Sequence, residues 1–134
     1  MNLAPLKRHA NWKYWVFKMF LFNFFLCIYY LFYFLELPKI IGKLDNLTVN
    51  EGQEAKFCVK FIGGNPRPQI KWFKENDEIF LSDEYQFADS EDSFQLVIQN
   101  ANRHNSGDFY AQLFSAVGTV NSNKSQLVVN CKLF

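Results

Sequence analysis

The sequence of 134 residues predicts an all-β sandwich over residues 38–130. Two observations lead to this prediction. Short runs of alternating apolar and polar residues recur along this part of the chain, with turn-forming residues between them. No run in the same part has the apolar spacing of an amphipathic helix. An aromatic-rich hydrophobic segment, residues 1–37, precedes the sandwich, and residues 131–134 form a short C-terminal tail.

The first long strand is predicted in AKFCVKF, residues 55–61, which alternates strictly after a tight turn at residues 50–52. Ala55, Phe57, Val59 and Phe61 share one face, and Cys58 lies on the opposite face with two lysines. The following GGNPRP, residues 63–68, cannot form a central strand, because its two prolines lack the N–H groups that a β-ladder needs.

The remaining strands follow at short intervals. IKWFK, residues 70–74, places Trp72 inward together with Ile70. YQF, residues 85–87, and FQLVI, residues 94–98, alternate again, while FYAQLF, residues 109–114, places Phe109, Ala111 and Leu113 on one face. SQLVV, residues 125–129, closes the series. The residues expected to build the core are Trp72, Val59, Ala111, Phe109, Leu96, Ile98 and Leu113.

From Pro38 to about Asn130 the chain resembles the I-set immunoglobulin family. The resemblance rests on PKIIGKLDNLTVNEG, on GNPRPQIKWFK around the core tryptophan, and on LVIQNANRHNSGDF. The family reads Leu-x-Ile-x-x-Ala-x-x-x-Asp-x-Gly-x-Tyr-x-Cys in the last segment. The same spacing here holds Leu96, Ile98, Ala101, Asn105, Gly107, Phe109 and Ala111. The resemblance implies an immunoglobulin-like antiparallel sandwich.

The disulfide that joins the two sheets in such domains is missing. The resemblance puts its second cysteine position at Ala111, and the alternation puts the first at Val59, because Cys58 is one residue off and faces the other way. The register of residues 55–61 stays open, since Gly63 and Gly64 look like a one-residue insertion. Asn105 and Phe109 replace the family's Asp and Tyr, which predicts the loss of a charged partner and of a hydroxyl hydrogen bond.

The missing bridge would close a loop of about fifty residues and is worth about 4 kcal/mol in the chain-entropy description. Small sandwiches in oxidising compartments usually keep such a bridge, so its loss favours a domain of the reducing cytosol. Among I-set domains, these segments are similar in sequence to the domains of titin, twitchin, projectin and obscurin. This implies a non-catalytic sarcomeric or cytoskeletal module that binds filament proteins or neighbouring immunoglobulin-like domains, or bears tension.

Other classes of function find little support in the sequence. A net charge of +1 is too small to attract nucleic acid by electrostatics. Three cysteines without a CxxC pair and two histidines offer few metal ligands, so we expect no metal, cofactor or catalytic site. One acidic group is either a partner-binding face or a solvated surface: Asp83, Glu84, Asp89, Glu91 and Asp92.

The N-terminal segment allows two interpretations. Met19 to Leu35 is seventeen residues long with Asn23 as its only strongly polar residue, which is close to the minimum for a membrane span. Four basic residues precede it and would keep the N-terminus inside, so residues 19–37 would anchor a single-pass adhesion or receptor protein. The sequons at Asn46 and Asn123 would suit that interpretation. Alternatively, the Phe, Tyr, Leu, Ile, Asn and Lys composition is that of translated AT-rich non-coding DNA, absent from the working protein.

Overall fold

The computed structural model describes residues 12–131, which divide into two units that meet between Leu35 and Glu36. The first unit holds the helix α1 (Trp12–Phe34) and the second holds ten strands and a short 3-10 helix. The helical N-terminal segment is confirmed. No Gly or Pro interrupts it, and bulky side chains such as Phe20 are exposed. No helix in the described part of the chain combines the length and apolar character needed to cross a membrane.

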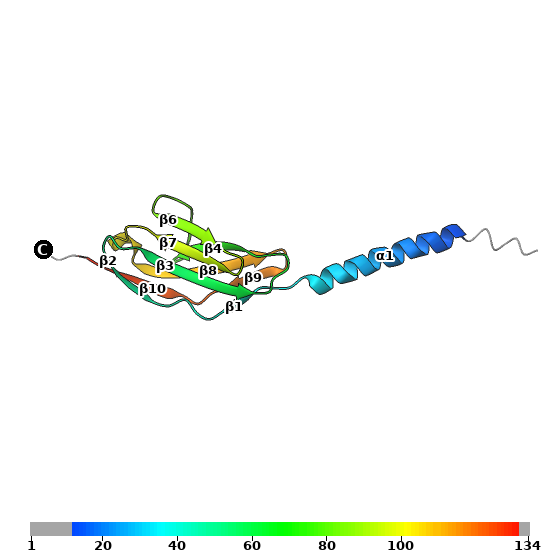
Figure 1. The fold of residues 1–134 in the computed structure, drawn as a ribbon, viewed down its shortest axis with the longest axis horizontal. Coiled ribbons are helices and arrows are strands. Elements are labelled where there is room, and N and C mark those ends of the chain that lie inside the picture. Colours follow the sequence, from blue (N-terminus) through cyan, green and yellow to red (C-terminus); the bar gives the residue numbers. More distant parts are fainter. Residues whose placement is uncertain (1–11, 132–134) are drawn as a thin grey trace, which may run out of the picture. The chain divides into compact units, whose positions relative to one another are not determined.

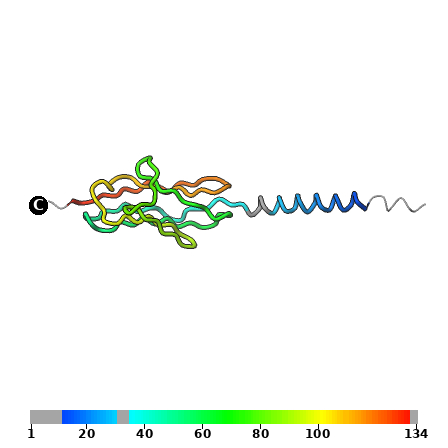
Figure 2. Tube along the Cα trace, turned by 90° about the horizontal axis from the view of Figure 1, so that it is seen from above, coloured from blue at the N-terminus to red at the C-terminus, as the bar shows by residue number. Residues whose placement is uncertain are grey.

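The second unit is a sandwich of two sheets that lie face to face (Figures 1 and 2). The first sheet is antiparallel, in the order β1 (Lys39–Ile41), β3 (Ala55–Ile62), β7 (Ser93–Ile98), β6 (Tyr85–Asp89). The second sheet has the order β2 (Leu47–Asn50), β10 (Ser125–Asn130), β8 (Gly107–Ser115), β4 (Gln69–Lys74), β5 (Asp77–Ile79), and β9 (Gly118–Asn121) pairs with β8. The pair β2–β10 is parallel, and the other pairs are antiparallel. The predicted fold class is confirmed.

The core fills the space between the sheets with the inward residues of each strand. Phe57 of β3 stacks on Phe109 of β8 with ring centroids 5.0 Å apart, so this aromatic pair joins one sheet to the other. The exposed fraction is 2% for Val59 and 0% for Trp72, Leu96, Ile98, Phe109, Ala111 and Leu113. The apolar side chains of β3, β7, β4 and β8 therefore form one continuous core.

The two positions that a bridge would occupy are both apolar and both buried. Ala111 is the register partner of Trp72 on β4, and Val59 pairs with Phe94 on β7. Cys58 pairs with Gln95 and is exposed on the outer face of its sheet. All three cysteines are free, so the described residues contain no disulfide, as predicted. The register that the sequence left open is thus the one that turns Cys58 outward.

The double glycine after β3 makes room for the segment that leads into the sandwich. Glu36 and Asn65 exchange two backbone hydrogen bonds of 3.0 Å each. Gly64 has a φ of +90°, and a Cβ there would lie 3.1 Å from both Pro38 and Pro68. The lead-in segment is therefore fixed to the loop after β3, and a larger residue at position 64 would push it away.

The double variant Val59→Cys with Ala111→Cys, made in a Cys58→Ser background, is expected to form a disulfide on oxidation. Both side chains point into the space between the sheets, and closing the loop stabilises the fold by up to about 4 kcal/mol, less any strain. Thiol counting and thermal unfolding with and without reductant measure the effect. With Cys58 restored, capture of the thiol at position 111 by Cys58 would contradict the register described above.

Candidate functional site

A buried asparagine organises the loop between β7 and β8. Asn105 ends the 3-10 helix η2 (Arg103–Asn105) and is 0% exposed. Its Oδ1 accepts a hydrogen bond from the Asn102 backbone N–H at 2.7 Å, which completes a capping box. Its Nδ2 donates to Glu84 Oε1 at 2.7 Å and to the Tyr85 hydroxyl at 3.1 Å. This one amide ties η2 to the start of β6.

The predicted loss of a charged partner at Asn105 is wrong. The partner is present, but it is the carboxylate of Glu84, and the asparagine amide donates to it. An aspartate at this position would set a second carboxylate against Glu84. Asparagine satisfies both sides of the contact because its amide offers an acceptor to the capping box and a donor to the acid.

Tyr85 takes part in the same network. Burial raises the pKa of the Tyr85 hydroxyl above its ordinary value of 10.0, and the negative charge of Glu84 raises it further. The hydrogen bond from Asn105 acts in the opposite direction but does not outweigh the burial. The hydroxyl therefore stays protonated at neutral pH and serves as a neutral hydrogen-bonding group.

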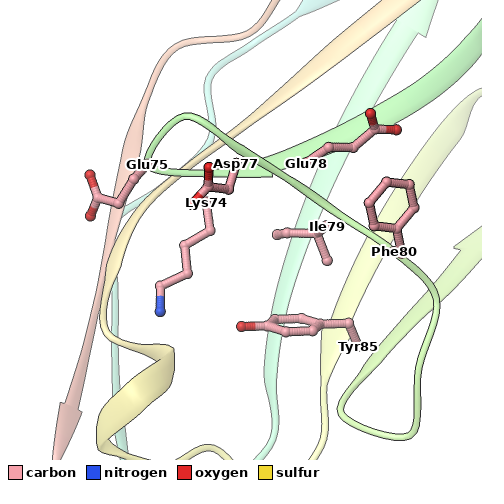
Figure 3. Close-up of a pocket in the computed structure, with 7 residues that line it drawn as sticks. All are labelled: Lys74, Glu75, Asp77, Glu78, Ile79, Phe80 and Tyr85. Carbon is pink, nitrogen blue, oxygen red and sulfur yellow. The ribbon is translucent and has the colours of Figure 1, made fainter.

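A hollow opens beside Tyr85 at the β5 edge of the second sheet (Figure 3). Its volume is about 370 Å³. We call it the β5 hollow, and its lining residues are Lys74, Glu75, Asp77, Glu78, Ile79, Phe80 and Tyr85. The Lys74 ammonium hydrogen-bonds the His104 backbone oxygen, which fixes this cation at one side of the hollow. Ile79 is buried at the base, while Phe80 is 70% exposed.

The acidic residues singled out from the sequence fall into two groups. Asp83 and Glu84 lie in the loop that leads from the β5 hollow into β6. Asp89, Glu91 and Asp92 lie at the other end of β6, where Asp89 pairs with Arg67 at 3.5 Å. The strand β6 separates the two groups, so these carboxylates do not form a single face. His104 is exposed in η2, and within residues 12–131 no cluster of His, Cys, Asp or Glu is placed to hold a metal ion.

Both sequon asparagines act as structural clamps. Asn123 accepts a hydrogen bond from the Leu44 N–H at 2.7 Å and donates to the Leu44 carbonyl at 3.0 Å. Asn46 Oδ1 accepts from the Gln126 N–H at 2.8 Å. The two amides thus join the segment between β1 and β2 to the start of β10. The sequence shows them only as Asn-x-Ser/Thr matches and gives no sign of this role.

Sequence reasoning also missed the β5 hollow. The signal was Phe80-Leu81, two bulky apolar residues in succession just before Ser82-Asp83-Glu84. Such a pair fits neither a strand alternation nor a turn, and the structure leaves Phe80 and Leu81 70% and 69% exposed. Adjacent exposed apolar residues beside a hollow are a candidate contact surface for another molecule.

The comparisons with known proteins agree with this architecture. Residues 38–129 match the sequence model of the immunoglobulin I-set domain. Titin of Drosophila melanogaster is 39% identical over 66 residues, which is 48% of this chain. The muscle M-line assembly protein unc-89 of Caenorhabditis elegans is 34% identical over 73 residues, or 54% of this chain. The matched segments make up 1% or less of the length of either relative.

A solved structure shows the same fold. The titin domain M7 superposes with a TM-score of 0.65 at 29% sequence identity. The match covers 69% of this chain and 93% of the titin domain. One whole sandwich of the solved structure therefore corresponds to one whole sandwich here.

Replacing Asn105→Asp is expected to destabilise the sandwich by about 2 kcal/mol at neutral pH. The change buries a carboxylate and removes the donor to Glu84. Adding Glu84→Gln should recover much of the loss, because the glutamine amide can then donate to the new carboxylate. Urea unfolding of the single and double variants gives the coupling between the two sites. If the loss of stability in the double variant equals the sum of the losses in the two single variants, the two side chains do not interact.

Proposed function

Because the chain belongs to the immunoglobulin I-set domain family, we propose that residues 38–130 are a non-catalytic, load-bearing and protein-binding module of a muscle filament protein. The observation that carries this proposal is the parallel pairing of β2 with β10. β10 is the last strand before the chain leaves the sandwich, and β2 is the second strand after the chain enters it, following β1 (Figure 1).

Tension along the chain loads this strand pair in shear. Four register pairs join the strands, from Leu47 with Leu127 to Asn50 with Asn130. The chain enters at one end of the sandwich and leaves at the other, and β2 and β10 run in the same direction between those ends (Figure 1). Pulling on the two ends would slide β2 against β10, so that all hydrogen bonds between them resist together. This arrangement suits a domain that transmits force.

The apolar bridge positions and the relatives support a muscle protein as the parent. A domain without the inter-sheet disulfide suits a reducing compartment, because nothing is lost there when the bridge is absent. The relatives named above are a titin and a protein whose name places it in assembly of the muscle M-line. Residues 1–37 have no counterpart in the matched family segment, and we infer that the working module begins after them.

The backbone of Val128 offers a direct test of load bearing. The Asn130 carbonyl accepts from Glu51 N–H on the β2 side at 2.9 Å, whereas Val129 N–H donates to Ser106 Oγ at 3.0 Å. Neighbouring residues of a strand direct their backbone groups to opposite sides, so the N–H of Val128 faces β2 like the carbonyl of Asn130. A proline at position 128 would remove a donor from the loaded pair.

Val128→Pro is expected to lower the unfolding force and to reduce stability by about 1–3 kcal/mol, because the ladder to β2 loses a donor and the proline ring distorts the strand. Val128→Ala keeps the N–H and is the matched control, with an unfolding force close to that of the original chain. Single-molecule stretching between the two ends measures both. A Val128→Pro chain that withstands the same force as Val128→Ala would contradict a load-bearing β2–β10 pair.

An antibody raised against residues 38–130 should label periodic bands in muscle and detect a long polypeptide in the cytoskeletal fraction. Serum against residues 1–37 should not label that polypeptide. Immunofluorescence and fractionated immunoblots make both measurements. A short glycosylated species that is released only by detergent and labelled on intact cells would replace the muscle-module proposal with a cell-surface protein.

A further inference from the structure

The β5 hollow combines an apolar base with an exposed apolar rim. Ile79 is 8% exposed and packs in the core, and Tyr85 is half-buried beside it. Phe80 and Leu81, in contrast, expose 70% and 69% of their surface. In Figure 3 the Phe80 ring stands at the opposite side of the hollow from the Lys74 ammonium. The surface therefore offers apolar contact that no part of the described sandwich uses.

The charge around the hollow is mainly negative. Residues 75–92 contain no Lys or Arg and eight carboxylates, which are Glu75, Asp77, Glu78, Asp83, Glu84, Asp89, Glu91 and Asp92. Three of these, Glu75, Asp77 and Glu78, line the hollow, and Asp83 and Glu84 follow in the loop between β5 and β6. Their potential selects a cationic partner and repels an anionic one.

Internal contacts neutralise only part of this charge. Glu78 pairs with Lys71 at 3.6 Å, and Glu75 Oε1 accepts a hydrogen bond from Asp108 N–H at 3.1 Å. Lys74 is the one cation that lines the hollow. Asp77 and Asp83 are exposed, and their carboxylates have no hydrogen bond or ion pair within residues 12–131. These two carboxylates are free to meet a cation from outside.

We propose that the β5 hollow, together with Leu81, docks an extended segment of a partner protein in which Lys or Arg residues flank bulky apolar side chains. The inference rests on the proposed function as a protein-binding module and adds the chemistry of the partner. An apolar side chain of the segment enters the hollow against Ile79, Phe80 and Tyr85. Its flanking cations face Asp77 and Asp83. A volume of about 370 Å³ is at the small end for a ligand pocket and suits one or two side chains of a peptide.

The test uses the full chain and a fluorescein-labelled peptide, GRKFLRKG, with binding read by fluorescence anisotropy. The expected result is saturable binding that weakens as salt is raised, because exposed charges are screened. Phe80→Ser with Leu81→Ser should raise Kd about tenfold through lost apolar contact. Asp77→Asn with Asp83→Asn should raise Kd about threefold through lost charge pairing. All four residues lie at the surface, and near-ultraviolet circular dichroism verifies folding.

Matched controls separate this surface from others on the sandwich. Ile41→Ser with Ile62→Ser removes two apolar residues that are 52% and 59% exposed on the other sheet, and Glu91→Gln removes a carboxylate away from the hollow. Both controls should leave Kd within about twofold. The peptide GRKSSRKG keeps the charge without the apolar pair and should bind weakly, and GEEFLEEG should not bind.

Several outcomes would overturn the proposal. They are equal binding of GRKSSRKG, unchanged affinity in both hollow variants, or absence of binding by GRKFLRKG at millimolar concentration. Sedimentation velocity provides the remaining check. Dimers of the original chain that disappear in Phe80→Ser with Leu81→Ser would assign the hollow to a second copy instead. A negative result here leaves the load-bearing role standing, since the stretching experiment on Val128 tests that role separately.

Discussion

Apolar contact between the two sheets replaces the covalent link, and every other feature of the sandwich depends on it. Val59 and Ala111 fill the bridge positions, and the Phe57–Phe109 stack crosses from sheet to sheet at 5.0 Å. A bridge of this span would contribute about 4 kcal/mol. Full burial of one large apolar side chain contributes about 1.5–3 kcal/mol, so the buried pair Phe57 and Phe109 contributes an amount comparable to the bridge. The core therefore holds the two sheets together without a disulfide.

Polar side chains then fix the loops onto that core. Asn105 joins η2 to the start of β6, and Asn123 joins the segment before β2 to the start of β10. Each amide both donates and accepts a hydrogen bond, which an ionised carboxylate of similar size could not do. Within the described residues, Trp72 Nε1 and Ser125 Oγ are buried without a hydrogen-bond partner. The core tolerates these two costs because the apolar burial around them is extensive.

The same architecture separates two properties of the module. In the proposed module, resistance to force comes from the parallel pair of β2 and β10. The proposed recognition surface is the β5 hollow, which is built from β4, β5 and the start of β6. The two surfaces share no strand, although both pack on the core that Trp72 and Ala111 help to build. A partner on the β5 hollow would therefore leave the loaded strands uncovered.

The sequence by itself indicated six of the strands, β3, β4, β6, β7, β8 and β10, and the alternation of their faces, because alternation in a strand is a local property, whereas β5 and β9 were not predicted. AKFCVKF already separates Val59 from Cys58, whatever the rest of the chain does. Contacts between distant residues could be decided only by the tertiary structure. Asn105 meets Glu84 across 21 positions and Asn123 meets Leu44 across 79, and no local pattern marks either pair. The β5 hollow was equally hidden, since its shape depends on how the β5–β6 loop closes over the edge of the sandwich.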